Sequence, residues 1–264
     1  MNLFHSILIS KRIRFIISSI FLLIGFTSIQ IFDDLNKFLF IGVLVLLTGI
    51  LSFWSFYEGM GKNMTLSALI LPMMFTLGVG MFWFLLPSSV YTRIPIIIFY
   101  TAGIYILLST MNIYTVSSSK TIALLRAARG VGFVLTLITS FLLFDAILSI
   151  RQYAFISSPL IFVVSILLFI QGFWSIELEK KIDSKIGLMT LISSLIVTEL
   201  SIAISFWPVT VVVGSLFLTS GVYMLLGLGQ TKLEDRLFPN SIREYITVGL
   251  IVLVGMFFAT HWGG

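Results

Sequence analysis

The stretch Gly130–Ile150, GVGFVLTLITSFLLFDAILSI, holds a single charged residue, Asp145. About 20 mostly apolar residues in a helix cross the roughly 30 Å hydrocarbon core of a bilayer, so this stretch predicts a transmembrane helix. The rest of the chain has the same character, because 58% of its 264 residues are hydrophobic and 10% are charged. Soluble domains contain roughly 25% charged residues. The composition therefore excludes a water-soluble fold.

The same criterion predicts an all-α fold, a polytopic bundle of nine transmembrane helices in one membrane domain, 1–264. No loop between these helices is long enough to hold a soluble domain. Ser241 and Glu244 form a capping box, which predicts a last helix that begins at Ile242. The nine predicted spans are Phe15–Ile31, Phe38–Tyr57, Ser67–Leu86, Ile94–Ile113, Gly130–Ile150, Pro159–Ile176, Ile186–Phe206, Val209–Leu228 and Ile242–Thr260.

The basic residues favour one orientation in the cell membrane. With the N-terminus inside, thirteen of the 16 Lys and Arg residues lie on the cytoplasmic side, and Lys37, Arg93 and Arg151 lie outside. Cytoplasmic loops carry such an excess, and nine spans then place the C-terminus outside. Topology alone can explain these cations, but some can also bind anionic lipid headgroups. The residues expected to do so are Arg14, Arg126, Arg129 and Arg243.

Landmarks recur at a spacing of about 115 to 120 residues. Phe53-Trp54-Ser55 closes the second predicted helix, and Phe173-Trp174-Ser175 closes the sixth. Arg14 and Arg129 stand before the first and fifth helices. These landmarks predict two tandem four-helix units in the same orientation, 1–116 and 117–230, followed by an extra helix in 231–264. Chance similarity between apolar helices is the alternative.

Two carboxyl groups lie inside predicted spans. Glu199 and Asp145 each lie several residues inside the outer end of a helix. A charged group within a membrane generally faces the bundle interior or a cavity and marks a functional site. We therefore expect Glu199 to face the interior, where Asp145 can line the same outward-facing cavity. A hydrogen bond that only holds two helices together is the simpler interpretation of Glu199.

The third predicted helix contains Pro72 in its interior, followed by Gly78 and Gly80. Proline removes one helical hydrogen bond and kinks the helix. In transporters, interrupted helices at corresponding positions of two repeats indicate the substrate site. The seventh helix, which corresponds to the third in the proposed repeat, contains no proline. The sequence thus predicts a helix interruption at Pro72, Gly78 and Gly80. The transporter pattern is present in only one of the two repeats.

Asp33 and Asp34 lie together in the first outer loop. This pair resembles membrane glycosyltransferases that use lipid-linked sugars, in which an acidic residue of the first external loop serves catalysis. The resemblance implies a catalytic role for Asp33 and Asp34. It covers nothing beyond the pair, because the loop is short and no polar external domain follows.

The sequence gives little support for a metal site or a cofactor. There is no cysteine, and the two histidines, His5 and His261, lie at opposite chain ends, so we expect no metal site and no cofactor. The expected partners are membrane lipids and a protein partner or second copy within the membrane, without nucleic acid. Three functions follow in order of preference: a non-enzymatic scaffold or accessory subunit, a carrier or channel that uses Glu199, and a lipid-directed enzyme that uses Asp33 and Asp34.

Overall fold

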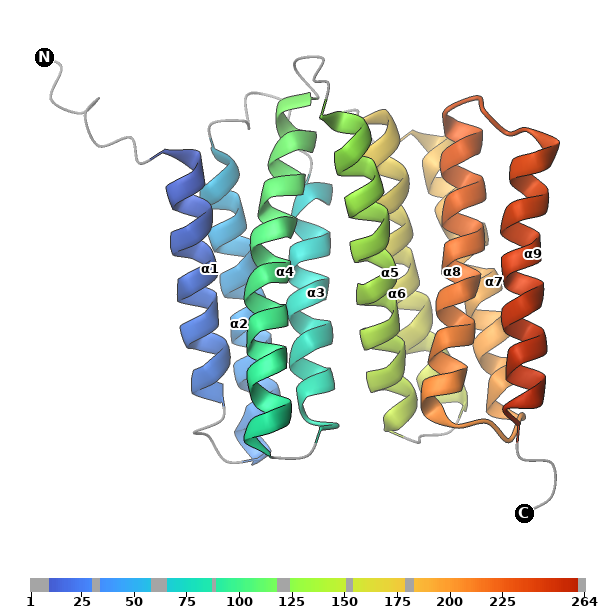
Figure 1. Ribbon diagram of the computed structural model, residues 1–264, viewed down its shortest axis with the longest axis horizontal. Coiled ribbons are helices and arrows are strands. Elements are labelled where there is room, and N and C mark those ends of the chain that lie inside the picture. Colours follow the sequence, from blue (N-terminus) through green and yellow to red (C-terminus); the bar gives the residue numbers. More distant parts are fainter. Residues whose placement is uncertain are drawn as a thin grey trace, which may run out of the picture.

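The computed structural model describes residues 10–29, 34–57, 66–86, 89–117, 124–150, 154–178 and 183–260. These residues form nine α-helices and no strand, as the sequence predicts for an all-α fold. The helices stand side by side and alternate in direction, so α1 begins and α9 ends at opposite ends of the bundle (Figure 1). Their bounds are α1 Lys11–Ser28, α2 Asp34–Phe56, α3 Ser67–Trp83, α4 Val90–Ser117, α5 Leu125–Ser149, α6 Ala154–Glu177, α7 Ser184–Ser205, α8 Val211–Leu233 and α9 Pro239–Phe258.

Seven of the helices in the described part are long and apolar enough to cross a membrane: α2 and α4 to α9. The helix α3 has 17 residues, which is slightly short for a span. The helix α1 has 18 residues but begins with the basic run that includes Lys11, Arg12 and Arg14. Each of the nine predicted spans overlaps one of the nine helices.

Several predicted helix starts are wrong. The helix α9 begins at Pro239 and not at Ile242, because proline at the first helical position has its φ preset and needs no helical N–H partner. The helices α4 and α6 begin before their prolines, and Pro95 and Pro159 are each the sixth residue of their helix. Proline at the sixth position leaves one carbonyl without its helical N–H donor.

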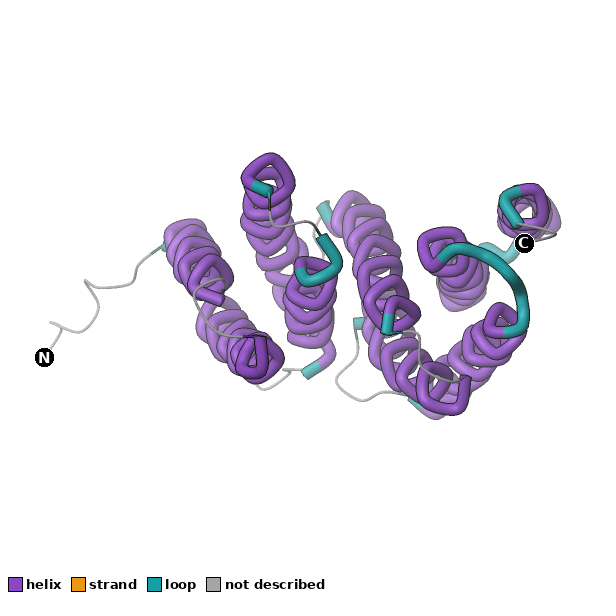
Figure 2. Tube along the Cα trace, turned by 90° about the horizontal axis from the view of Figure 1, so that it is seen from below, coloured by secondary structure: helices purple, strands orange, loops and turns teal. Residues whose placement is uncertain are grey.

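The helices pack in two groups of four (Figure 2). In the first group, α1 and α3 each contact α2 and α4, and α2 also touches α4. In the second group, α5 and α7 each contact α6 and α8, and α6 also touches α8. The groups join where α5 packs against α3 and α4 and where α6 packs against α3, while α9 lies against α8. The two groups thus have the same set of neighbouring pairs.

The shared tripeptide lies in different surroundings in the two groups. Trp174 is 2% exposed and meets the ring of Tyr114 edge-on at 6.3 Å between ring centroids. Trp54 is 37% exposed. The reason is the position of each helix, because α6 lies at the junction of the two groups and α2 at the edge of the bundle.

Polar side chains connect the helices inside each group. Thr76 of α3 bonds Thr48 of α2 at 3.1 Å and Tyr100 of α4 at 3.3 Å, and all three are buried. In the second group, the hydroxyl of Thr136 in α5 donates to Gln171 of α6 at 3.4 Å. Such bonds satisfy polar groups away from water and add modest interhelical stability, about 0.6 kcal/mol each on average.

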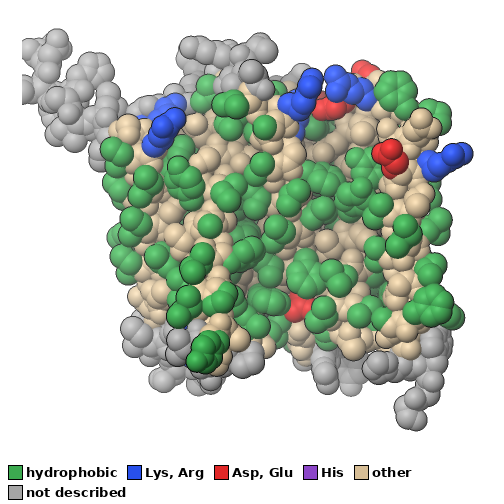
Figure 3. Space-filling model, in the orientation of Figure 1, with side chains coloured by type: hydrophobic (Ala, Val, Ile, Leu, Met, Phe, Trp, Pro, Cys, Tyr) green, Lys and Arg blue, Asp and Glu red, His purple; other side chains and the backbone are tan. Residues whose placement is uncertain are grey.

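The surface divides into an apolar body and one basic end. Figure 3 shows hydrophobic side chains across most of the visible face, while the Lys and Arg side chains gather along the upper edge. Large apolar residues such as Leu46, Ile50 and Ile251 are 63–65% exposed. An apolar surface of this extent suits contact with lipid tails and not with water.

Candidate functional site

Glu199 lies on the exposed face of α7. Its neighbours on that face include Leu195 and Ile202, which are 44% and 42% exposed. Glu199 makes no hydrogen bond or ion pair with any residue that the structure describes. The expectation that Glu199 faces the bundle interior is therefore wrong. The inward face of α7 instead carries a stripe of hydroxyl residues, among them Thr190, Ser194 and Ser201, together with buried apolar residues such as Val197.

Asp145 is buried in α5 and is 4% exposed. Ser215 of α8 approaches its carboxylate at 3.4 Å, while the same hydroxyl donates to the carbonyl of Val211 at 2.8 Å. Ser215 is the one hydrogen-bonding partner of Asp145 among the described residues. Asp145 thus points between α5 and α8, whereas Glu199 points away from the bundle. The structure does not bring the two carboxyl groups into one cavity.

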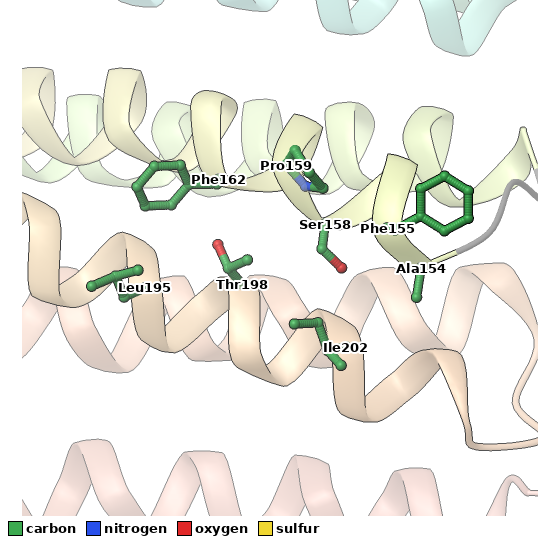
Figure 4. Close-up of a pocket in the computed structure, with 8 residues that line it drawn as sticks. All are labelled: Ala154, Phe155, Ser158, Pro159, Phe162, Leu195, Thr198 and Ile202. Carbon is green, nitrogen blue, oxygen red and sulfur yellow. The ribbon is translucent and has the colours of Figure 1, made fainter.

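A hollow of about 620 Å³ lies between α6 and α7, beside the face that carries Glu199. In Figure 4, Phe155 and Phe162 of α6 and Leu195 and Ile202 of α7 line it. Ser158 bonds the buried Ser201 of α7 at 3.1 Å. The lining is almost wholly apolar, and the hollow opens to the surface. We call it the α6–α7 groove; its residues are Ala154, Phe155, Ser158, Pro159, Phe162, Leu195, Thr198 and Ile202.

A smaller and more polar cavity of about 220 Å³ lies where α5, α6, α7 and α8 meet, at the end of the bundle opposite the basic edge. The predictions from the sequence do not include this cavity, because its hydroxyl groups come from three separate helix ends. A cluster of Ser and Thr at those ends is the signal that indicates it. We call it the outer chamber; its residues are Leu148, Ser157, Ser201, Ile204, Ser205, Trp207, Val209, Thr210, Val211 and Gly214.

The helix α3 continues from Ser67 to Trp83 through Pro72, so it is not broken there. Its two glycines have a packing role. A Cβ on Gly78 would lie 3.3 Å from Leu142 of α5, and one on Gly80 would lie 3.2 Å from Ile41 of α2. The absence of side chains lets α3 approach both neighbours closely. Pro72, Gly78 and Gly80 are all buried.

The four arginines expected at lipid headgroups occupy two kinds of position. Arg129 bonds Glu234, which directly follows α8, at 2.8 Å and the carbonyl of Ile176 in α6 at 2.6 Å. Arg14 is 6% exposed. Arg14 is thus buried in the bundle and Arg129 partly so, whereas Arg126 and Arg243 are exposed. Contact with anionic lipid headgroups stays a prediction for all four.

The structure does not describe the side chains of the predicted pair Asp33 and Asp34. Asp33 lies outside the described residues, and for Asp34 the structure describes the backbone, as the first residue of α2, but not the side chain. Within the described ranges, no three His, Cys, Asp or Glu side chains come together as metal ligands.

These features define the class of the protein: it is a helical membrane protein, with seven apolar helices of spanning length among its described residues. A family model described as protein of unknown function (DUF5656) matches residues 23–259. The match covers most of the chain, and the protein belongs to this family. Neither the curated proteins nor the solved structures give a match.

Proposed function

We propose that this protein is a non-enzymatic scaffold or accessory subunit of the cell membrane, which binds the transmembrane helix of a partner protein on its α6–α7 face. Glu199 carries the proposal. It lies six residues before Ser205, the last residue of α7, which is about 9 Å by helical rise. That depth places the carboxyl group within the apolar region, on an exposed surface and without a partner in the described part of the chain.

A carboxyl group exposed to lipid is costly. Insertion scales assign about 2.5–3.5 kcal/mol to a charged residue at the centre of a transmembrane helix. The cost falls when the group pairs with another polar or charged side chain, which is why intramembrane carboxyls generally face a protein neighbour. This chain supplies no such neighbour from its described residues. A second protein that covers the face would supply it.

The α6–α7 groove indicates the shape of that partner. It adjoins Glu199 through Thr198 and Ile202, and it is apolar and open to the surface. Transmembrane helices associate by close packing and by interhelical hydrogen bonds. The partner is therefore a transmembrane helix whose apolar side chains fill the groove. It carries a Lys, Arg or amide side chain in its outer half, opposite Glu199.

The proposed topology has nine spans, with the N-terminus in the cytoplasm and the C-terminus outside. Its support is the basic edge of the bundle, which contains exposed Arg126 and Arg243 together with Lys232 and Arg236. A positively charged end is typical of the cytoplasmic side. In this orientation Arg126 and Arg243 meet the anionic headgroups of the inner leaflet.

The proposed duplication pairs α1 to α4 with α5 to α8. Its support is the shared set of neighbouring helix pairs, together with the common position of Arg14 and Arg129 near the starts of α1 and α5. Both units have the same orientation, because equivalent helices are four positions apart in the chain and successive helices alternate in direction. The helix α9 is then an addition to the second unit.

Site-specific photo-crosslinking in native membranes tests the proposed partner. A benzophenone side chain replaces Leu195 or Ile202, and matched controls carry it at Leu46 or Ile50 on the exposed face of α2. We expect one discrete adduct of constant mass from the two α7 positions and none from the α2 positions. Glu199→Leu should lower the adduct yield about three- to tenfold, in line with measured interhelical polar contacts.

Glu199→Gln distinguishes the kind of contact. A yield equal to that of the unchanged chain indicates a hydrogen-bonded partner, and a yield as low as that of Glu199→Leu indicates a cationic one. Equal adduct yields from the α7 and α2 positions contradict the proposal. An adduct yield that is unchanged by Glu199→Leu contradicts it as well. An adduct that joins two differently tagged copies of this chain also contradicts it, because the face would then bind the protein itself.

A further inference from the structure

The outer chamber presents hydrogen-bond acceptors. Ser201 donates its hydroxyl proton to the carbonyl of Thr198 at 2.7 Å, and Ser205 donates to the carbonyl of Ile202 at 2.7 Å. Thr210 uses its hydroxyl oxygen to accept from the backbone N–H of Val213 at 3.4 Å. Because the serine protons are engaged with the backbone, what these side chains have left to offer is oxygen lone pairs.

The indole N–H that lies at the chamber is also engaged. Trp207 donates it to Thr260 at 2.8 Å. The helix ends at the chamber add no net preference, because α6 and α8 begin there while α5 and α7 end there. Two positive and two negative ends of helix dipoles offset one another.

The buried pair of Asp145 and Ser215 lies one helical turn further into the bundle. Leu148 of α5 and Val211 of α8 line the chamber. Asp145 precedes Leu148 by three residues and Ser215 follows Val211 by four, so each shares a helix face with the chamber residue. The hydrogen bond between Asp145 and Ser215 shows that these faces meet. The Asp145–Ser215 pair therefore lies one helical turn deeper in the bundle than Leu148 and Val211, the chamber residues of α5 and α8.

Asp145 has more acceptor capacity than its surroundings use. A carboxylate offers about four lone-pair positions, whereas Ser215 approaches one oxygen at 3.4 Å with a hydroxyl that already bonds Val211. Buried charges in proteins are paired or bind metal ions. No basic side chain among the described residues pairs with Asp145.

We propose that the outer chamber and the Asp145–Ser215 pair form a binding site for one small monovalent cation, either an alkali-metal ion or a primary ammonium group. The chamber oxygens coordinate the cation, and Asp145 supplies the single countercharge. A carboxylate one turn away attracts a cation strongly in a low-dielectric interior. A volume of about 220 Å³ equals roughly seven water molecules at 30 Å³ each, which accommodates a small ion with part of its hydration shell. The proposal does not depend on a partner at the α6–α7 groove, although Ser201 of the chamber bonds Ser158 of the groove at 3.1 Å.

Thermal unfolding of the full chain in lipid nanodiscs tests the site. The midpoint is measured against rising NaCl, KCl or methylammonium chloride, and N-methylglucamine chloride keeps the ionic strength constant. A ligand that binds the folded state raises the midpoint with increasing concentration above its Kd. We expect such a rise with at least one of the three salts. A response to Na⁺ or K⁺ alone identifies a metal ion, and a response to methylammonium alone identifies an ammonium group.

Variants locate the effect. Asp145→Asn should weaken the apparent affinity at least tenfold, and Glu244→Gln should leave it unchanged, because Glu244 is exposed near the start of α9, at the opposite end of the bundle. Should Asp145→Asn fail to fold, Ser215→Ala and Thr210→Val provide the same test with smaller expected losses. An unfolding midpoint that does not rise with any of the three cations overturns the proposal. A cation response that survives all three site variants overturns it as well.

Discussion

Arg129 joins three helices at the basic end of the molecule. Its guanidinium group lies near the start of α5 and bonds both Glu234, just after the end of α8, and the carbonyl of Ile176 near the end of α6. The side chains of Arg129 and Glu234 are 27% and 25% exposed, so solvent screens the ion pair only in part. Arg236 approaches the other carboxylate oxygen of Glu234 at 3.8 Å. This network holds together the ends of helices that no short loop connects.

Replacing Arg129 with alanine should destabilise the folded bundle by about 1–2 kcal/mol, because a charged hydrogen-bond network that is partly screened is lost. Arg126→Ala is the matched control. Arg126 lies three residues earlier in α5 and is exposed, so its loss should change stability by less than about 0.5 kcal/mol. Reversible unfolding in mixed micelles measures both values. Equal stability of the two variants would mean that the Arg129 network contributes nothing.

At the scale of single helices, the contact between α3 and α5 depends on a missing side chain. Gly78 faces Leu142 and Leu143 of α5, and a Cβ at this position would lie 3.3 Å from each. Leu142 presents its Cβ, which cannot rotate away, so a larger residue at position 78 must push the two helices apart. This contact is also one of those that join the two groups of four helices.

Gly78→Val should therefore destabilise the protein by about 1–3 kcal/mol, the usual cost of an overpacked interior. Gly42→Val provides the control. Gly42 is exposed on α2, and no atom lies within 4 Å of its missing Cβ, so this variant should be stable to within about 0.5 kcal/mol. The unfolding midpoint of each purified variant gives the comparison. A stable Gly78→Val variant would show that α3 and α5 are not in close contact.

The position of each helix could be predicted from the sequence, but the direction in which it faces could not. Apolar runs located every helix, because the length of a span is set by the bilayer. The hydrophobic pattern alone does not show on which side of α7 Glu199 lies, since α7 is apolar around most of its circumference. The stripe of Thr190, Ser194 and Ser201 does mark the inward face, because small and hydroxyl residues concentrate at helix contacts. Glu199 does not belong to that stripe, which indicates that it lies on the exposed face of α7.

The candidate sites were harder to predict than the fold. Asp145 stands out in the sequence as the single charged residue between Gly130 and Ile150, but its partner Ser215 lies 70 residues away. The outer chamber combines residues from the ends of four helices. No periodicity within one helix records such an arrangement, because it depends on how the helices pack around one another. Local patterns also misplaced the start of α9, where Pro239 prevailed over the capping box at Ser241.

For the whole molecule, the account predicts a bundle in which all nine helices cross the membrane and the basic end faces the cytoplasm. The two groups of four helices share their neighbouring pairs, and α9 makes the number of spans odd. The short α3 and the basic start of α1 are the elements on which this count depends. If either helix does not cross the membrane, every later loop lies on the opposite side.

Cysteine labelling tests this count directly, because the chain has no cysteine of its own. Single cysteines replace Lys62, Lys181, Lys232, Gln152 or Gly264, and a membrane-impermeant maleimide is applied to right-side-out vesicles. The account predicts labelling at positions 152 and 264 in intact vesicles, and at the three lysine positions only after the vesicles are opened. Protection of position 264 in intact vesicles, or labelling of position 232, would contradict a nine-span bundle with its basic end inside.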